Sequence, residues 1–207
     1  MDERGTDVIG WLNPAAPGAH GLLVRHAARE NIDDSVSVWE ANLTPKGEAD
    51  ALTFGRSLTP FSYGGAYASP IPRCMNTAAL ILEGWGHGSK TVQADWLLLN
   101  AYVRDKAAVK AQFEVRDSDQ LVLDHVAGES LHGFSPIAEG SALLLSEIRQ
   151  RMRPGTLTLF VSHDALLMPF FAHFFGQRFS KASWFPCLHG AVILDSEDGA
   201  YINGKKI

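Results

Sequence analysis

Basic and imidazole side chains stand at three points where an apolar segment of the sequence ends. Arg25 and His26 follow the run LLV, and His163 with Asp164 follows the run LFVS. Arg73 comes shortly after a third apolar segment, GGAYASP. If these segments are parallel strands of one sheet, their carboxyl ends open onto one crevice. Arginine forks match phosphate oxygens bidentately, and guanidinium groups gathered beside imidazoles favour an anion between them, so a phosphate is the expected occupant.

The elements that must position these residues alternate along the chain between short apolar runs and longer helical patterns. This alternation predicts an α/β domain, a three-layer sandwich in which a mostly parallel central sheet has helices on both faces. We find no repeat or linker, so residues 1–207 are expected to form one domain. The strands are expected in the segments GLLV, GGAYASP, TVQA, TLTLFVS, GAVILDS and AYINGK.

Capping signals place the helices. In LTPKGEADALTFGRSL, Thr44 is a typical N-cap and Pro45 suits the first helical position. Ser69 or a neighbour is expected to cap the helix in SPIPRCMNTAALILEG, which puts Arg73 in the first turn. Further helices are expected over Asp105 to Phe113, in SPIAEGSALLLSEIRQRM and in ALLMPFFAHFFG, while RDSDQ is expected to be an exposed turn.

The composition of the chain restricts the binding partners and the cellular location that we expect for the protein. A net charge of −5 and a pI near 5.9 do not favour a nucleic-acid or membrane-surface partner, because such proteins gather lysine and arginine on one face. Two cysteines are too few for a disulfide framework, and MDERGTDVIG lacks the pattern of a secretory signal. We therefore expect a cytoplasmic protein with reduced thiols and no membrane-spanning segment.

Five motifs, LVRHA, LTPKGEADA, YASPIPRCMNTA, GES and FVSHD, resemble in order and spacing those of the histidine phosphatase (phosphoglycerate-mutase-like) superfamily. They span residues 22–164, about two-thirds of the chain. The resemblance implies that His26 is a nucleophile that becomes phosphorylated, and that Arg25, Arg73 and His163 complete the phosphate pocket. One departure is Ala27, where the family usually has glycine.

The proton donor is the larger departure from that family pattern. The mutase-like branch uses a glutamate soon after the third strand, and Asn100 stands at the comparable place, where an amide cannot transfer a proton. The branch that includes acid phosphatases and phytases uses the aspartate of a His-Asp pair. The resemblance thus makes Asp164 the leading acid, with a pKa raised by burial beside a phosphate dianion. Asp105 and Glu129 are alternatives, and Asp164 is also a candidate cap for the helix after it.

Other polar residues are assigned with less direct arguments. Arg29, Glu30 and Asn31 are expected either at the mouth of the pocket or in a solvated turn. Asn100 and Asp105 lie in an irregular region that also offers substrate contacts. The segment DHVAGESLHG could suggest a metal site, but zinc ligands usually have tighter and more regular spacing, so no metal or other cofactor is expected. Trp184, with the Phe-Pro that follows it, is expected to form a packed turn.

Together these features predict a metal-independent phosphatase that hydrolyses a phosphomonoester through a phosphohistidine on His26, with Asp164 protonating the leaving group. Its partner would be a small phosphorylated substrate or a phosphoprotein. Three alternatives stay open: a phosphoglycerate-mutase-type phosphotransferase, a phosphohistidine protein phosphatase, and a non-catalytic phospholigand-binding protein.

Overall fold

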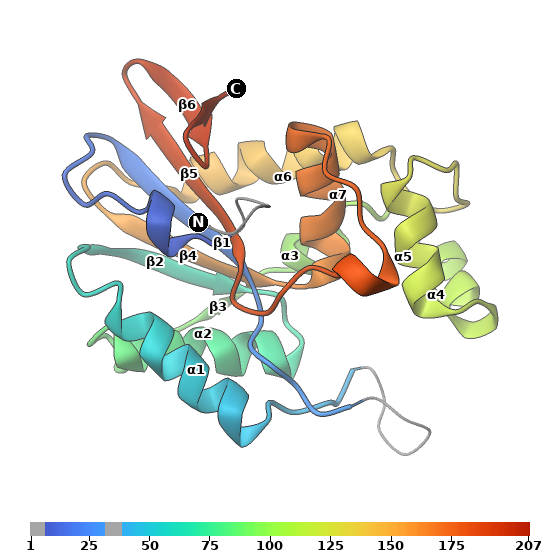
Figure 1. Cartoon of the computed structure of the whole chain (residues 1–207), viewed down its shortest axis with the longest axis horizontal. Coiled ribbons are helices and arrows are strands. Elements are labelled where there is room, and N and C mark those ends of the chain that lie inside the picture. Colours follow the sequence, from blue (N-terminus) through green and yellow to red (C-terminus); the bar gives the residue numbers. More distant parts are fainter. Residues whose placement is uncertain (1–6, 32–38) are drawn as a thin grey trace.

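A seven-stranded sheet forms the centre of the computed structural model, which describes residues 7–31 and 39–207 (Figure 1). The strand order is β3-β2-β4-β1-β5-β6-β7. Strands β3, β2, β4 and β1 run parallel, whereas β5, β6 and β7 are each antiparallel to the strand before them in this order. The strands are β1 (Ala19–Arg25), β2 (Tyr63–Ala68), β3 (Gln93–Ala94), β4 (Leu157–Ser162), β5 (Gly190–Ser196), β6 (Gly199–Ile202) and β7 (Lys205–Lys206).

Helices cover both faces of this sheet, as predicted. Figure 1 shows α1 and α2 together on one face and α6 and α7 on the other, with α4 and α5 beyond α7. The three-layer, mostly parallel architecture is therefore confirmed. The helices are α1 (Pro45–Arg56), α2 (Pro72–Gly84), α3 (Leu97–Asn100), α4 (Lys106–Val115), α5 (Ser118–Val126), α6 (Ile137–Arg151) and α7 (Asp164–Phe175), with 3-10 turns η1 (Ile9–Trp11) and η2 (Lys181–Ser183).

The core is divided in two by the sheet, because successive side chains of a strand point to opposite faces. Leu22 and Val24 pack in the cluster that includes residues of α1 and α2, whereas Leu23 packs in the cluster that includes residues of α6 and α7. All three side chains are fully buried. Burial of each stabilises the fold by roughly 1.5–3 kcal/mol as an upper estimate, so the residues just after β1 rest on a well-packed support.

Two local predictions differ from the structure. The segment RDSDQ is largely exposed, as predicted, but only Arg116 and Asp117 lie between helices: Asp117 accepts a hydrogen bond from the Gln120 amide at 2.8 Å and caps α5, which begins at Ser118. Ser69 does not cap α2, whose N-cap position is occupied by Ile71 without a side-chain bond. The Asp117 side chain makes a local bond but begins a helix instead of a turn, whereas the Ser69 hydroxyl bonds to His163, which is distant in the sequence.

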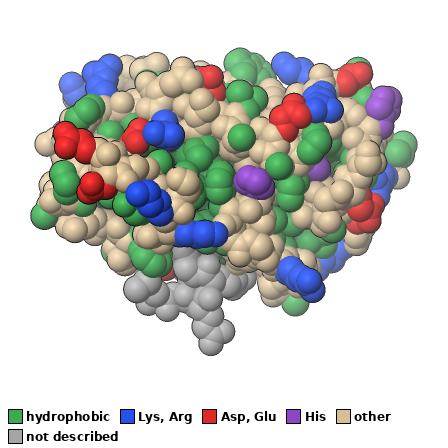
Figure 2. Space-filling view, turned by 90° about the horizontal axis from the view of Figure 1, so that it is seen from above, with side chains coloured by type: hydrophobic (Ala, Val, Ile, Leu, Met, Phe, Trp, Pro, Cys, Tyr) green, Lys and Arg blue, Asp and Glu red, His purple; other side chains and the backbone are tan. Residues whose placement is uncertain are grey.

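No helix in the described ranges is long and apolar enough to cross a bilayer. On the face drawn in Figure 2, basic and acidic side chains are interspersed with apolar ones rather than gathered by sign.

Candidate active site

The carboxyl ends of β1, β2 and β4 meet at one edge of the sheet, because β4 pairs in parallel with both other strands (Figure 1). Arg25 lies opposite Ser162 at the end of the β1–β4 pair, and Ala68 lies opposite Val161 at the end of the β2–β4 pair. The predicted convergence of three strand ends is confirmed. We call the side chains that meet there the polar cluster: Arg25, His26, Arg73, His163 and Asp164.

His26 is held with one ring nitrogen available as a nucleophile. Its side chain is only 1% exposed, and its Nδ1 lies 2.8 Å from the carbonyl oxygen of Ala27. Because a carbonyl only accepts, Nδ1 carries the proton and donates it, which leaves the lone pair on Nε2. Nε2 accepts a hydrogen bond from Nε of Arg73 at 3.1 Å. Burial, assisted by the charges of Arg25 and Arg73, lowers the pKa of His26 from 6.5 to about 3, so the ring is neutral at pH 7.

Arg73 joins the two imidazoles. It lies in the first turn of α2, is 7% exposed, and places Nη2 3.1 Å from Nδ1 of His163. A guanidinium only donates, so Nδ1 of His163 accepts and its Nε2 carries the proton to Oγ of Ser69, 2.8 Å away. Burial, followed by the charge of Arg73, lowers the pKa of His163 well below its usual value. Both rings are therefore neutral, with centroids 5.5 Å apart.

Arg25 has two of its three nitrogens engaged. Nη2 forms an ion pair with Oδ2 of Asp164 at 2.6 Å, and Nη1 donates to the carbonyl oxygen of Phe185. Nε is buried and has no hydrogen-bond partner in the described parts of the chain. An unsatisfied buried donor costs about 1–3 kcal/mol, which an oxygen of a bound anion would remove. The cluster thus contains a cationic donor suited to a phosphate oxygen.

The charges of the cluster also favour an anion. Its two imidazoles are neutral, so the guanidiniums of Arg25 and Arg73 face the single carboxylate of Asp164. Arg29 adds a third guanidinium: burial lowers its pKa, and both Asp164 and Arg25 act on it electrostatically. Its Nη1 donates to the carbonyl of Glu30 at 2.7 Å. Arg29 is therefore near the cluster, as the prediction of a residue at its mouth requires.

Asp164 differs from its sequence-based prediction. Burial alone would raise its pKa, but Arg25, the indole of Trp184 and the two imidazoles oppose burial and hold the pKa well below its ordinary value. Oδ1 accepts from the Ala165 amide at 2.8 Å, but Asp164 is the first residue of α7 and His163 occupies the N-cap position, so the prediction of an N-cap at Asp164 is wrong. In the cluster itself, the ion pair with Arg25 stabilises the charged form more than burial disfavours it. A pKa raised beside a phosphate dianion stays a prediction.

Two residues that sequence reasoning missed support the nucleophile and Arg73. Oγ1 of Thr77 accepts from the Ala27 amide at 3.1 Å and donates to the Arg73 carbonyl at 2.7 Å. Thr77 lies one helical turn after Arg73, and this spacing of four residues is the sequence signal from which its contact with Arg73 could have been predicted. Ser69, expected as a helix cap, instead holds the ring of His163.

The motif LTPKGEADA positions the loop after the nucleophile. The Thr44 amide donates to the Ala28 carbonyl at 3.0 Å, and Oγ1 of Thr44 accepts from the Gly47 amide at the start of α1. A Cβ on Gly47 would lie 2.1 Å from the Ala28 oxygen, far inside van der Waals contact. Glycine is therefore required there for the helix to approach the loop that follows His26.

The remaining predicted residues have other local roles. Asp105 caps α4 by accepting from the Ala107 and Ala108 amides, Asn100 ends α3, and Asn31 is exposed. Glu129 is exposed beyond the end of α5. In the same segment His125 is buried and donates from Nε2 to the Ser135 carbonyl at 2.9 Å, while Asp124 pairs with Arg116. Within residues 7–31 and 39–207, no three His, Cys, Asp or Glu side chains are grouped to hold a metal ion.

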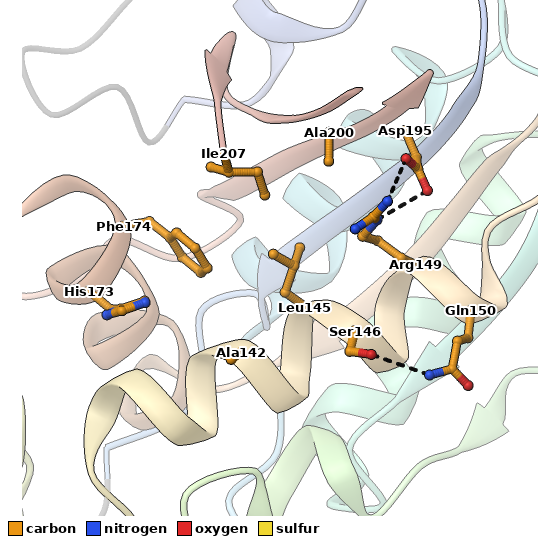
Figure 3. A pocket seen from close by; sticks show the side chains of 10 residues that line it. All are labelled: Ala142, Leu145, Ser146, Arg149, Gln150, His173, Phe174, Asp195, Ala200 and Ile207. Atoms are coloured by element: carbon orange, nitrogen blue, oxygen red, sulfur yellow. Dashed lines mark hydrogen bonds and ion pairs between the residues drawn. The ribbon is translucent and has the colours of Figure 1, made fainter. Parts of the chain in front are cut away.

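A surface groove is separate from the polar cluster. Figure 3 shows it between α6, the end of α7 and strands β5 and β6, with Arg149 paired to Asp195 across it. Asp195 lies opposite Ala19 at the start of β1, whereas His26 follows the end of that strand. The groove therefore lies toward the opposite end of the sheet from the candidate nucleophile.

Comparison with known proteins agrees with this geometry. The chain belongs to the histidine phosphatase superfamily (branch 1), whose family model matches residues 22–200. Among solved structures it is similar to YhfR of Bacillus stearothermophilus, with a TM-score of 0.60 and 20% identity over 91% of this chain and 98% of that one. A phosphoglycerate mutase from Bacillus anthracis gives a TM-score of 0.55 and 14% identity over 94% and 92% of the two chains.

A mutant phosphoserine phosphatase from Entamoeba histolytica in complex with phosphoserine gives a TM-score of 0.55 and 18% identity, over 88% of this chain and 94% of that one. A search of curated protein sequences gives no significant match. Since these structures are distant in sequence, they establish the fold that the chain shares with phosphatases and mutases. The family resemblance predicted from the motifs is confirmed, and phosphatase-like activity is supported in general terms.

Proposed function

We propose that the protein is a metal-independent phosphatase that hydrolyses a phosphomonoester through a phosphohistidine formed on His26. The observation that carries this proposal is the neutral ring of His26, whose Nδ1–H is bound to the Ala27 carbonyl and whose Nε2 lone pair faces Arg73. A neutral imidazole with a fixed tautomer is a competent nucleophile, and the neighbouring guanidiniums supply the charge that a phosphoryl group requires.

The reaction has two steps. Nε2 of His26 gives up the hydrogen bond from Arg73 and forms a bond to phosphorus, while the bond from phosphorus to the ester oxygen breaks. The alkoxide leaves and takes a proton from solvent water. Arg25, Arg73 and His163 stabilise charge on the equatorial oxygens, which is the main protein contribution in phosphoryl transfer. Water then attacks phosphorus, the phosphorus–nitrogen bond breaks, and the proton that the water loses returns to the solvent, which leaves inorganic phosphate and a neutral imidazole.

A second candidate is favoured by the charge on Asp164. Because the pKa of this carboxyl is held low, the group is poorly suited to protonate an alkoxide. A substrate whose leaving group needs no strong acid avoids this requirement. The phosphohistidine side chain of a protein is such a substrate, so a phosphohistidine protein phosphatase is the second candidate. Comparing hydrolysis of phosphohistidine and phosphoserine peptides distinguishes the two.

The proposed function is tested by trapping the covalent intermediate. The purified protein is mixed with radiolabelled aryl phosphate and quenched in alkaline detergent, which preserves phosphohistidine. We expect labelled protein that loses its label in acid, and no label on the His26→Asn variant. Label that persists in this variant would overturn the assignment of the nucleophile, and turnover without any labelled intermediate would overturn the two-step reaction.

Two further measurements complete this experiment. Thermal unfolding of His26→Asn checks that the variant is folded, since His26 is buried and its amide bonds to the Ser162 carbonyl. Adding an unlabelled alcohol or glycerate acceptor during turnover tests the phosphotransferase alternative. Label that moves to the acceptor in preference to water would favour a mutase-type reaction over hydrolysis.

A further inference from the structure

The segment between η2 and β5 contacts both members of the Arg25–Asp164 pair. Nε1 of Trp184 donates to Oδ2 of Asp164 at 2.8 Å, and this is the same oxygen that binds Nη2 of Arg25. The next residue, Phe185, accepts a hydrogen bond from Nη1 of Arg25 through its carbonyl. Two consecutive residues of this segment, Trp184 and Phe185, therefore bind the carboxylate and the guanidinium of the pair.

This segment is itself held in place by the core. The side chain of Phe185 is fully buried and its ring lies 5.1 Å from that of Phe171 on α7. At the end of the segment that precedes β5, the Leu188 amide donates to the Arg25 carbonyl at 3.1 Å, and the Arg25 amide donates to the His189 carbonyl at 2.9 Å. Trp184 is thus placed by a buried neighbour and by backbone bonds to β1, so its indole N–H approaches Asp164 from a defined position.

We propose that Trp184 is a positioning residue, which fixes the Asp164 carboxylate on Arg25 and thereby holds the Arg25 guanidinium for the phosphoryl group. The proposal rests on the proposed function and assigns to Trp184 a role more specific than the packed turn expected from sequence. In the part of the chain that the structure describes, Nε of Arg25 has no hydrogen-bond partner, and the direction of this donor is fixed only while Nη1 and Nη2 keep theirs.

Removal of the indole N–H has a defined electrostatic consequence. A hydrogen bond to the charged form lowers the pKa of a carboxyl, so its loss raises the pKa of Asp164, which is then protonated at a higher pH. Other groups act on Asp164 as well, and none of them is changed by a substitution at Trp184. These are Arg25 and His26 after β1, Arg29 in the loop beyond them, Arg73 and Cys74 on α2, His163 before α7, and Cys187 before β5.

The test uses Trp184→Phe, which keeps an aromatic ring but removes the donor. Binding of inorganic phosphate is measured by calorimetry, and we expect a dissociation constant about 3- to 10-fold weaker, within the range of one ordinary hydrogen bond, because the lost bond acts on phosphate only through Asp164 and Arg25. The matched control is Trp85→Phe, which removes an indole N–H bound to the Phe61 carbonyl at 3.1 Å, away from the cluster. This control should bind phosphate as the wild type does, even if it unfolds at a lower temperature.

A double-mutant cycle separates positioning from general support of the fold. If Trp184 acts through Asp164, Trp184→Phe should weaken phosphate binding less than twofold in an Asp164→Ala background. An equal loss in both backgrounds would overturn the proposal.

A carbon-13 NMR titration of the Asp164 carboxyl provides a readout that needs neither turnover nor phosphate. Its pKa should rise in Trp184→Phe and stay unchanged in Trp85→Phe. If the protein binds no phosphate, the proposed function fails while this titration still decides the role of Trp184. An unchanged pKa in Trp184→Phe would overturn that role.

Discussion

The charge of Asp164 makes a prediction about leaving groups that separates two roles for this residue. We consider Asp164→Asn, measured on nitrophenyl phosphate and on an alkyl phosphate. A general acid is needed for the alkoxide and hardly for the nitrophenolate, so loss of an acid slows the alkyl substrate alone by roughly 10²- to 10⁴-fold. Loss of a positioning partner of Arg25 should impair both substrates equally, because in the proposed reaction Arg25 contacts the phosphoryl group that the two substrates share.

The structure sets the expected size of the effect. The Arg25–Asp164 pair is largely shielded from water, with 12% and 21% of the two side chains exposed. Asparagine keeps an acceptor oxygen but loses the charge, and a hydrogen bond between such charged groups contributes about 1.5–3 kcal/mol. Since 1.4 kcal/mol corresponds to tenfold, we expect kcat/KM to fall about 10- to 100-fold. The factor should be the same for the two substrates.

The assay is steady-state hydrolysis across pH, with Asp105→Asn and Glu129→Gln as matched carboxyl-to-amide controls. Asp105 caps α4 and Glu129 is exposed, so neither control should slow either substrate. Because the pKa of Asp164 is held low, wild-type activity on the alkyl substrate should not depend on protonation of this group above pH 5. A loss confined to the alkyl substrate in Asp164→Asn would refute this reasoning and identify Asp164 as the acid.

Four further predictions follow from the same geometry. Arg73→Lys keeps the charge but cannot bind both imidazoles and a phosphate, so kcat should fall on the order of 10²-fold, and a loss under threefold would show that the fork is not needed. Gly47→Ala places a Cβ against the Ala28 carbonyl, so activity should fall at least about tenfold by displacement of the loop after His26; wild-type kcat in this variant would refute that account. The lowered pKa of His26 means that the unfolded chain binds its proton first, so stability is lost as pH falls from 6.5 toward about 3. Urea unfolding at pH 7 and pH 5 should show a loss in the wild type larger by about 2 kcal/mol than in His26→Asn. Treatment with EDTA should leave turnover unchanged, and activity lost to EDTA and restored by zinc or magnesium would contradict the metal-independent reaction.

The strands and the polar cluster could be predicted because the relevant signals are local. The apolar runs before Arg25 and His163 are long enough to define buried strands, and parallel strands necessarily bring their carboxyl ends together. The identity of the cluster then followed from residue types alone. The helix α5 was missed for the opposite reason: its first turn is polar, and the cap at Asp117 can be distinguished from a turn only once the helix is seen.

Interactions across long sequence separations explain the errors at the site. Ser69 has the residue type of a cap, but its partner is His163, 94 residues away, and no local rule includes that residue. For Asp164 the decisive partners are Arg25 and Trp184, which the chain supplies from β1 and from a segment after α7. Sequence position showed that this aspartate is at the site, but its ionisation depends on donors that only the folded chain brings to it.

The ionisation of Asp164, as distinct from its position at the site, affects which leaving groups the protein can handle. Asn100 stands where mutase-like relatives would be expected to carry a glutamate, and the pKa of Asp164 is held low by Arg25 and Trp184. If the cluster binds phosphate through its guanidiniums, as proposed, its ionised carboxylate leaves it better suited to stabilise the phosphoryl group than to assist the leaving group. Substrates should therefore be ranked by the basicity of the leaving group: a steep dependence of kcat/KM on that basicity in the wild type is expected. A flat dependence would require a proton donor outside the five residues of the polar cluster.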